Sequence, residues 1–361
     1  MQEKISKFMK NTGLFICLFS VVLFGGNAAA AETDAVQTTA DYSDMMLIPY
    51  GKTSGIKLFA DGIMVVELSA ISSDYGERSV AANAGIQVGD MITHVNGVKI
   101  TSTEHFQSMI DKCNGSAVQL TVVRNNKSMK IRVTPDKSAS DGKYRIGAWV
   151  RDSMAGIGTI TFIDPKTGIF GALGHGICDV DTGKLMPFAS GSIVPSTITS
   201  IKKGVSGTPG ELRGEFEASK DIGIFYSNTD KGIFGKITER ALYSTLKPVP
   251  VAKRNEIQIG HATIVSNISG NSCKTYEIEI TKIYEGNADG DKNMLITVTD
   301  KRLLDSTGGI VQGMSGSPVL QNGKLIGAVT HVLVNDPKKG FAIFIDNMLS
   351  NTKFEKMPKA A

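Results

Sequence analysis

A serine placed between glycines is the first candidate for chemistry in this chain of 361 residues. Ser315 lies in the segment GMSGSP (residues 313–318), which precedes an apolar strand. A tight turn there would expose the Ser315 hydroxyl and let backbone N–H groups converge on the oxygen of a tetrahedral intermediate. We predict Ser315 as a nucleophile, with the N–H groups of Gly313 and Ser315 as oxyanion donors. Because such clusters are usually only turns, the prediction depends on finding a base.

A serine nucleophile needs a histidine near it, and the chain has five histidines. His175 lies in GALGHG (residues 171–176), at the end of an apolar strand and between glycines, where its ring can reach a neighbouring loop. His94 and His105 belong to a different module, whereas His261 and His331 lie within strands and are interpreted as packed or surface residues. His175 is therefore the predicted base.

The third member of such a site is a carboxylate that fixes the histidine tautomer and stabilises its charged form. Asp221 opens an apolar strand 46 residues after His175, as the acid does in two-barrel serine proteases. Asp300 follows a strand and lies 15 residues before Ser315. Both satisfy the order His, Asp, Ser, so the sequence leaves the two as alternatives.

The elements that must position these residues are predominantly strands. From residue 144 to about 349 the chain consists of short β-rich runs separated by glycine, with no sustained helical period until the last few residues. Many short strands with turn residues between them predict an all-β barrel or sandwich.

A separate module occupies residues 48–136. It has a β-branched run over 62–69 and the string AGIQVGDMI (84–92), and Asn96-Gly97 follows. Thr101 and Glu104 have capping-box spacing before a predicted helix, and Asn125-Asn126 predicts the turn of a hairpin.

This module resembles a PDZ domain of the kind attached to bacterial proteases. PDZ domains bind a peptide by adding it as a strand to a sheet edge. The resemblance implies an edge at Gly55, Ile56 and Lys57, with His105 and Met109 facing the peptide from the helix. The alternative is that these are ordinary core and edge residues.

The chain resembles the SpoIVB peptidase family of endospore formers. The resemblance rests on three long strings besides the His175 segment, namely GAWVRDS with AGIGT (147–159), GGIVQGMSGSP (308–318) and GAVTHV (327–332). It implies a mainly β fold, with a PDZ domain (α+β) followed by a trypsin-like double β-barrel serine peptidase domain at 144–350. It also implies Ser315 as nucleophile, His175 as base and Asp300 as the position of the family's acid.

The resemblance further implies a sporulation signalling endopeptidase that cleaves itself and a membrane-bound regulator of sigma factor precursor processing. A peptide-binding scaffold without enzymatic activity and an HtrA-like quality-control protease are the alternatives. HtrA proteases usually carry their PDZ domain after the peptidase, whereas here it comes first. No cofactor or metal is expected, because metalloprotease, Cys-X-X-Cys and phosphate-loop motifs are missing from the sequence.

The N-terminus predicts export. Three lysines precede an apolar run from Gly13 to Gly26, and small residues follow up to Ala31. This pattern is typical of a signal peptide, or of an N-terminal membrane anchor, over residues 1–31. A polar linker is predicted at 32–47. The resemblance to the SpoIVB peptidase family implies that the exported protein is anchored or released in the space between forespore and mother cell.

Composition excludes several other classes. The net charge of +4 is interspersed along the chain, so no basic tract suggests nucleic acid. Removal of residues 1–31 leaves a net charge of +2. The three cysteines beyond the apolar run are widely spaced and odd in number, which indicates that the fold does not depend on disulfides.

Overall fold

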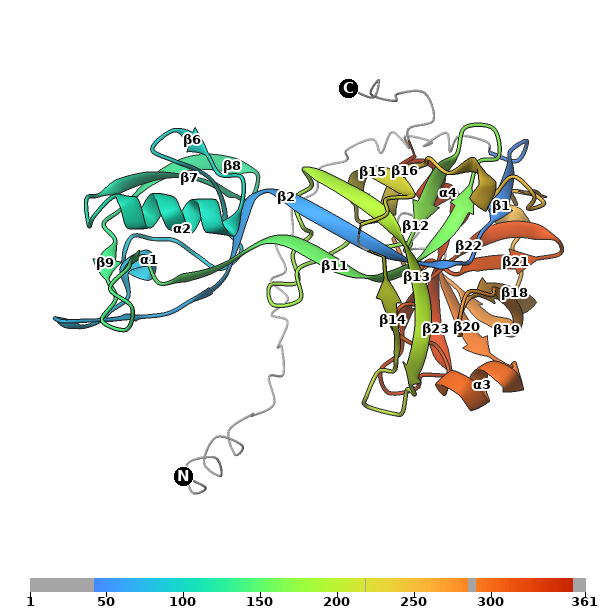
Figure 1. Cartoon of the computed structure of the whole chain (residues 1–361). Helices are drawn as coiled ribbons and strands as arrows, with labels where there is room; N and C mark the ends of the chain where they lie inside the picture. Colours follow the sequence, from blue (N-terminus) through green and yellow to red (C-terminus); the bar gives the residue numbers. More distant parts are fainter. Residues whose placement is uncertain (1–41, 218, 285–289, 353–361) are drawn as a thin grey trace, which may run out of the picture. The chain divides into compact units, whose positions relative to one another are not determined.

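The computed structural model describes residues 42–217, 219–284 and 290–352, and these fold mainly as strands (Figure 1). The predicted export segment and most of the predicted linker lie outside the described residues. Within the described part of the chain, no helix is both long and apolar enough to cross a bilayer.

The first barrel is closed by two strands of 16 residues each, β2 (Thr53–Leu68) and β11 (Ala148–Ile163). The order of strands is β11, β12, β16, β15, β13 and β2. Because β2 pairs with β11 as well as with β13, the six strands form a ring. The other strands of the ring are β12 (Ile169–Ala172), β13 (Ser190–Lys202), β15 (Gly223–Thr229) and β16 (Gly232–Ile237).

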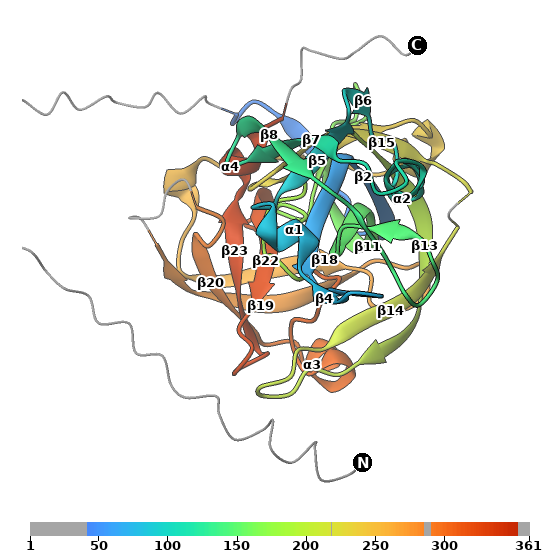
Figure 2. The same cartoon turned by 90° about the vertical axis from the view of Figure 1, so that its left-hand side faces the viewer.

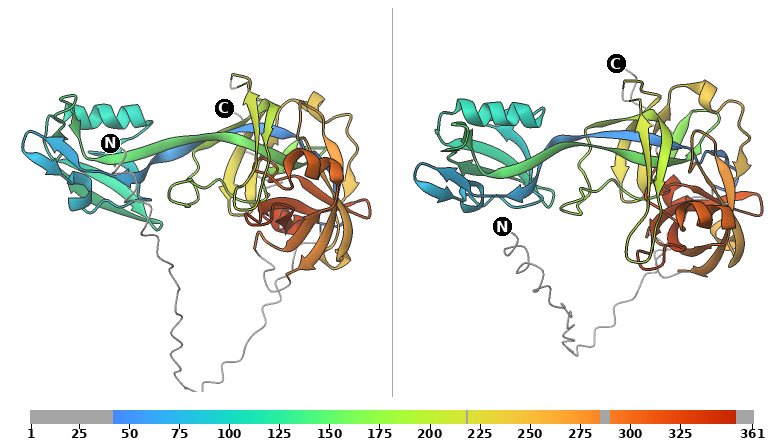
Figure 3. Two further views of the ribbon diagram at one scale, coloured as in Figure 1. Left: turned by 90° about the horizontal axis from the view of Figure 1, so that it is seen from below. Right: turned by 60° about the horizontal axis from the view of Figure 1, so that its bottom comes forward.

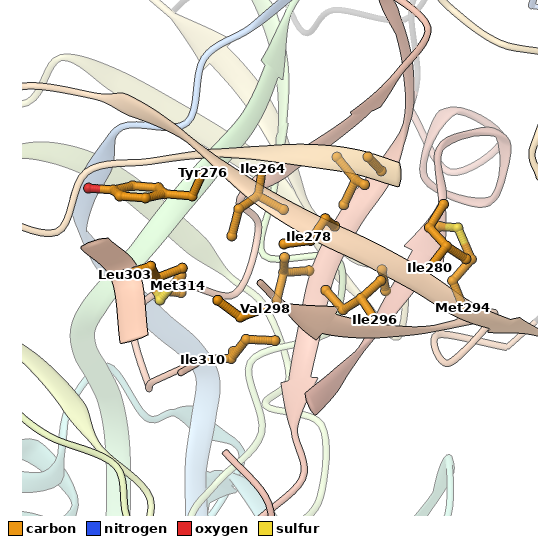
Figure 4. Packing of buried hydrophobic residues seen from close by; sticks show 14 of the residues in the cluster. Ile264, Tyr276, Ile278, Ile280, Met294, Ile296, Val298, Leu303, Ile310 and Met314 are labelled. Atoms are coloured by element: carbon orange, nitrogen blue, oxygen red, sulfur yellow. The ribbon is translucent and has the colours of Figure 1, made fainter. Parts of the chain in front are cut away.

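The second barrel is also closed, with the order β18, β19, β20, β23, β22 and β21. Its strands are drawn in orange to red in Figure 2. Their alternate residues point inward, as in Tyr276, Ile278 and Ile280 of β19, which are at most 3% exposed (Figure 4). The strands are β18 (Gly260–Ser266), β19 (Lys274–Ile283), β20 (Met294–Val298), β21 (Pro318–Gln321), β22 (Lys324–Val332) and β23 (Lys339–Phe344). Two closed rings confirm the predicted double barrel.

A third core belongs to the PDZ-like module. Phe106 and Ile110 of helix α2 (Thr103–Lys112) pack against the strands β5 (Met91–Val95), β7 (Val118–Arg124) and β8 (Lys127–Val133). The β7–β8 turn has Asn125 and Asn126 at φ +49° and +61°, which confirms the hairpin. The cap differs from the expected box, because the N-cap is Ser102, whose hydroxyl accepts the His105 N–H at 3.1 Å.

Shorter elements complete the described chain. Two of them matter for the site: α3 (Lys301–Thr307) precedes the Ser315 segment, and α4 (Ile345–Leu349) follows β23. The remaining elements are β1 (Met46–Pro49), β3 (Ile71–Ser73), β4 (Gly76–Arg78), α1 (Val80–Asn83), β6 (Val98–Lys99), β9 (Asp136–Lys137), β10 (Tyr144–Arg145), β14 (Glu211–Phe216), η1 (Arg240–Leu242), β17 (Val249–Pro250) and η2 (Arg254–Glu256).

The modules share their long strands, which the predicted boundaries at 136 and 144 do not capture. The first half of β2 pairs with β11 and β13 inside the first barrel, so residues 53–59 belong to the peptidase fold. The second half of β2 pairs with β5, and Ile146, Ala148 and Val150 pack into the PDZ core. The two strands, blue and green in Figure 3, stay paired from one module into the other. The PDZ module is therefore an insertion within a strand pair of the barrel.

Candidate active site

The turn that carries Ser315 is held by strands from both barrels. From β11 in the first barrel, Thr159 donates its hydroxyl to the Gly313 carbonyl at 2.8 Å and its N–H to the Ser315 carbonyl at 3.1 Å. In the second barrel, Gly316 donates its N–H to the Val329 carbonyl on β22 at 2.7 Å. Gly316 has a φ of +93°, and a Cβ there would lie 2.1 Å from the Thr159 oxygen. Only glycine therefore fits behind the serine.

The predicted oxyanion donors have unoccupied N–H groups. Thr159 occupies the carbonyls of Gly313 and Ser315, but the N–H groups of these two residues donate to no acceptor within the described part of the chain. A pair of backbone donors with no internal partner, on either side of Met314, is the arrangement that an oxyanion requires.

His175 follows β12 in a strained turn. Leu173 and Gly174 both have left-handed backbone angles, at φ +71° and +70°. The His175 Nδ1 lies 2.9 Å from the Gly176 carbonyl oxygen. Because a carbonyl oxygen can only accept, Nδ1 carries the proton and Nε2 has a free lone pair. This tautomer is the one that accepts a proton from a serine.

Burial lowers the pKa of His175, an effect that the Gly176 carbonyl and the Asp291 carboxylate partly oppose. The ring is therefore neutral at neutral pH, as a base must be. His175 and Ser315 line the same cavity, whose volume is about 600 Å³. The structure thus brings these two predicted residues, with Gly313, to one place. Their catalytic roles stay a prediction.

The cavity is apolar. Among the residues that the structure describes, no Asp, Glu, Lys or Arg lines it, and most of its wall consists of apolar side chains. The wall includes Ile310 and Val311, which precede the Ser315 turn, and Val332 of β22. Ile56 of β2 and Ile157 of β11 contribute from the first barrel.

Asp221 lies at the wrong end of its strand to reach His175. It precedes β15, is paired with Lys57 at 2.8 Å and has a side chain 53% exposed. The His175 loop instead meets the other end of β15, where Asn228 Oδ1 accepts the Ile177 N–H at 2.8 Å. Seven residues at about 3.3 Å each place Asp221 and Asn228 about 23 Å apart.

Asp300 is a helix cap. Its carboxylate accepts the Arg302 N–H at 2.8 Å at the start of α3, and also accepts the Glu277 N–H at 3.2 Å. The Arg302 guanidinium beside it lowers the pKa of Asp300 to about 2. Neither Asp221 nor Asp300 lines the cavity that holds His175 and Ser315. The structure therefore does not bring either predicted acid to the base.

A different carboxylate lies near the two histidines of the cavity. Asp291 Oδ2 is 3.7 Å from His331 Nδ1, and the His331 ring lies 5.1 Å from the His175 ring, centroid to centroid. The sequence pattern did not single out Asp291, which precedes β20 in a polar segment. The sequence predicts His331 as a packed or surface residue of a strand. The structure instead places it in the cavity wall, with its ring beside that of His175.

The expected PDZ edge is not free, and the structure corrects it. Gly55, Ile56 and Lys57 pair with β11 on one side and with β13 on the other. They belong to the first barrel, where Ile56 is 6% exposed. The cause is the length of β2, which continues from the barrel into the PDZ module.

The unpaired edge beside helix α2 is instead the start of β11, whereas the other edge of this sheet is β8. Along Ala148–Ser153 this strand pairs only with β2 within the described residues. A hollow of about 390 Å³ lies beside it, lined by Phe106 and Ile110 of α2 and by the 145–149 segment. His105 and Met109 lie on α2 but do not line this hollow, and His105 Nδ1 is bonded to Thr101.

Two family models match the chain. The model described as SpoIVB peptidase S55 matches residues 142–349, and the PDZ domain model matches residues 71–124. Among curated proteins, the serine endoprotease DegQ of Escherichia coli is 36% identical over 76 residues, which is 21% of this chain and 17% of DegQ. A protein described as a zinc metalloprotease, from Lactococcus lactis, is 35% identical over 111 residues, or 29% of this chain and 25% of the relative. The chain thus spans a quarter or less of these relatives.

Two solved structures are similar to parts of the chain. The PDZ domain of an SdrC-like protein from Listeria monocytogenes is 22% identical with a TM-score of 0.21, covering 25% of this chain and 87% of that one. The Rv3671c protease of M. tuberculosis in its active form is 13% identical with a TM-score of 0.32, covering 58% and 78%. The assignment rests on the peptidase model, which covers more than half of the sequence. This chain therefore belongs to the SpoIVB peptidase family of serine peptidases and carries a PDZ domain.

Proposed function

We propose that the chain is a serine endopeptidase that acts through an acyl-enzyme at Ser315. The observation that carries the proposal is one cavity that holds Ser315, the free N–H groups of Gly313 and Ser315, and His175 in the tautomer that accepts a proton. A peptidase needs these three parts in one place.

The reaction follows from the roles of these groups. His175 Nε2 takes the Ser315 hydroxyl proton as the oxygen attacks the peptide carbonyl, and the two N–H groups bind the resulting oxyanion. His175 then gives the proton to the leaving amine, which leaves an acyl group on Ser315. Water, deprotonated by the same ring, hydrolyses this ester.

The wall of the cavity indicates the substrate class. Protein segments with an aliphatic or aromatic side chain next to the scissile bond would bury it against Ile310, Val311 and Val332. A charged substrate side chain would lose its hydration without gaining a charged partner from the described lining, which contains no Asp, Glu, Lys or Arg.

The physiological role that we propose is sporulation signalling. The enzyme would be exported to the space between forespore and mother cell, anchored there or released, and would cleave itself near its N-terminus. It would then cleave a membrane-bound regulator of sigma factor precursor processing. Family membership and the basic and apolar N-terminal pattern support this role. Its PDZ module would hold a partner's peptide along the free β11 edge, Ala148–Ser153.

A fluorophosphonate probe tests the activity. We expect the wild type and the control Ser306→Ala, on α3, to be labelled, and Ser315→Ala to remain unlabelled. Equal labelling of wild type and Ser315→Ala would refute the proposed nucleophile. An unlabelled wild type that still binds peptides would favour the scaffold alternative.

The role in sporulation needs its own test. In an endospore former whose own copy of this gene is deleted, wild type should restore processing of the late sigma factor precursor, whereas Ser315→Ala should not. Processing restored by Ser315→Ala would contradict the signalling role. Unselective digestion of unfolded proteins by the purified enzyme would favour the quality-control alternative.

A further inference from the structure

The base of the proposed site has a second imidazole behind it. The ring of His331, on β22, lies 5.1 Å from that of His175, with an angle of 39° between the planes. His331 Nδ1 is buried and has no hydrogen-bond partner within the described residues. It faces Asp291 Oδ2 at 3.7 Å. Buried polar atoms are normally hydrogen-bonded, and this one faces a carboxylate without bonding to any described residue. Such an arrangement indicates a functional role.

Asp291 is fixed in this place by its neighbours. The Thr330 hydroxyl donates to the Asp291 carbonyl at 2.9 Å, which joins the segment to the strand of His331. Two residues later, Asn293 Oδ1 accepts the Phe344 N–H at 2.8 Å, and the Asn347 amide donates to the Gly290 carbonyl at 3.1 Å. The carboxylate is thus held against the second barrel.

The charges around the rings are few. Burial and the neighbouring His175 lower the pKa of His331 to about 4, while Asp291 opposes the shift and Lys292 adds to it. Burial also lowers the pKa of His175, and Asp291 again opposes the shift. Burial and Asp291 raise the pKa of the Cys178 thiol, which lines the same cavity and is therefore neutral at neutral pH. Asp291 is thus the negative charge that both rings sense, and the rings themselves are neutral.

We infer that Asp291 and His331 act as positioning residues for His175, in the place that the sequence assigned to Asp221 or Asp300. The neutral His331 ring packs against His175 and keeps its orientation. The Asp291 carboxylate stabilises the imidazolium that forms when His175 takes the Ser315 proton. The tautomer does not depend on this carboxylate, because the Gly176 carbonyl already holds Nδ1–H.

Because the Gly176 carbonyl holds the tautomer and Asp291 supplies only the charge, the expected rate loss of Asp291→Asn can be calculated. In a Ser-His-Asp triad one carboxylate both fixes the tautomer and stabilises the charge, and its change to Asn costs about 10⁴-fold in rate. Here the charge alone would be lost. A carboxylate near an imidazole typically shifts its pKa by about one unit or more, so Asp291→Asn should cost about tenfold in rate. The inference rests on the proposed acyl-enzyme mechanism.

The test is the pH profile of fluorophosphonate labelling by the full-length protein. Asp291→Asn should lower the rate about tenfold at pH 8 and move the acid limb to lower pH by about one unit. His331→Ala, which removes the ring that packs against His175, should lower the rate more than His331→Phe, which keeps a ring there. Asp291→Glu, which keeps the carboxylate, should retain most of the wild-type rate. The matched controls are Asp305→Asn and His261→Gln, both on exposed surface, and both should keep the wild-type profile.

A second measurement is independent of activity. The pKa of His175, followed by NMR in Ser315→Ala protein, should fall when Asp291→Asn is added and stay constant when Asp305→Asn is added. The inference is overturned if Asp291→Asn leaves both the rate within twofold and the His175 pKa unchanged, or if Asp221→Asn or Asp300→Asn moves that pKa instead. An unlabelled wild type would refute the proposed function, and the NMR titration would still decide the inference.

Discussion

Substitution of Asp300 separates the helix-cap role seen in the structure from the acid role implied by the family resemblance. Its pKa lies at about 2 instead of 3.8, and each pKa unit corresponds to about 1.4 kcal/mol. The full shift would therefore stabilise the fold by about 2.5 kcal/mol. Because Arg302 is 64% exposed, screening by solvent reduces this to about 1–2 kcal/mol.

Two variants separate the contribution of the Asp300 charge to the unfolding free energy from that of the helix cap. Asn at position 300 still caps a helix, so Asp300→Asn removes the charge alone and should cost about 1–2 kcal/mol of unfolding free energy at pH 7. Asp300→Ala removes the cap as well and should cost about 1 kcal/mol more. A carboxylate whose pKa is lower in the folded state than in the unfolded state stabilises the fold at pH values above its unfolded pKa. The difference between wild type and Asp300→Asn should therefore disappear as the pH falls from about 4 to about 2.

Urea unfolding measures these differences, with Asp305→Asn on the same helix as control, and probe labelling of the folded fraction measures the rate. We expect Asp300→Asn to lose stability and to react at a rate within tenfold of wild type. Unchanged stability combined with a rate loss of about 10³-fold or more would show that Asp300 is the acid, and would refute the placement argued from the structure.

Three further outcomes are expected. Gly316→Ala should destabilise the protein by more than about 3 kcal/mol and abolish labelling, because its Cβ would lie 2.1 Å from a backbone oxygen. The control Gly323→Ala, in open space with a similar positive φ, should cost only about 1 kcal/mol. Equal losses of unfolding free energy in urea for the two variants would contradict this reasoning. Because burial lowers the pKa of His175, labelling should rise with pH through a midpoint below 6.5, and a midpoint above 6.5 would argue against His175 as base. Arg124→Met leaves the Asp90 carboxylate, 1% exposed, without its guanidinium and should destabilise the PDZ module by about 3–5 kcal/mol in thermal unfolding. An unchanged midpoint would show that the Gln87 N–H, which Asp90 also accepts at 2.8 Å, is sufficient to satisfy the carboxylate.

Local patterns were sufficient for the parts of the protein that depend on neighbouring residues. The β7–β8 hairpin could be predicted because two asparagines tolerate positive φ. The Ser315 turn could be predicted because its glycines lie beside the serine. His175 could be chosen because it ends an apolar strand between glycines.

The features that could not be predicted depend on which segments meet in space. Asp291 reaches His331 only because Thr330 and Asn347 hold its segment against the second barrel. Gly55 was predicted at a peptide-binding edge because the β-rich pattern around it is typical of a PDZ strand. This prediction was wrong, since the first half of β2 pairs within the barrel. The number of residues between His175 and an aspartate contains no information on their distance.

The insertion of the PDZ module within a strand pair has a consequence for folding. Phe59 pairs with Ser153 in the first barrel, so that barrel cannot close until the 93 residues between them bring their ends together. For a flexible chain, this closure costs about 2–3 kcal/mol more than for a five-residue turn. A folded PDZ module removes most of that entropic cost, because its own sheet delivers the two strands already paired. Destabilising the module should therefore slow maturation of the peptidase, even though the module contributes no residue to the Ser315 turn.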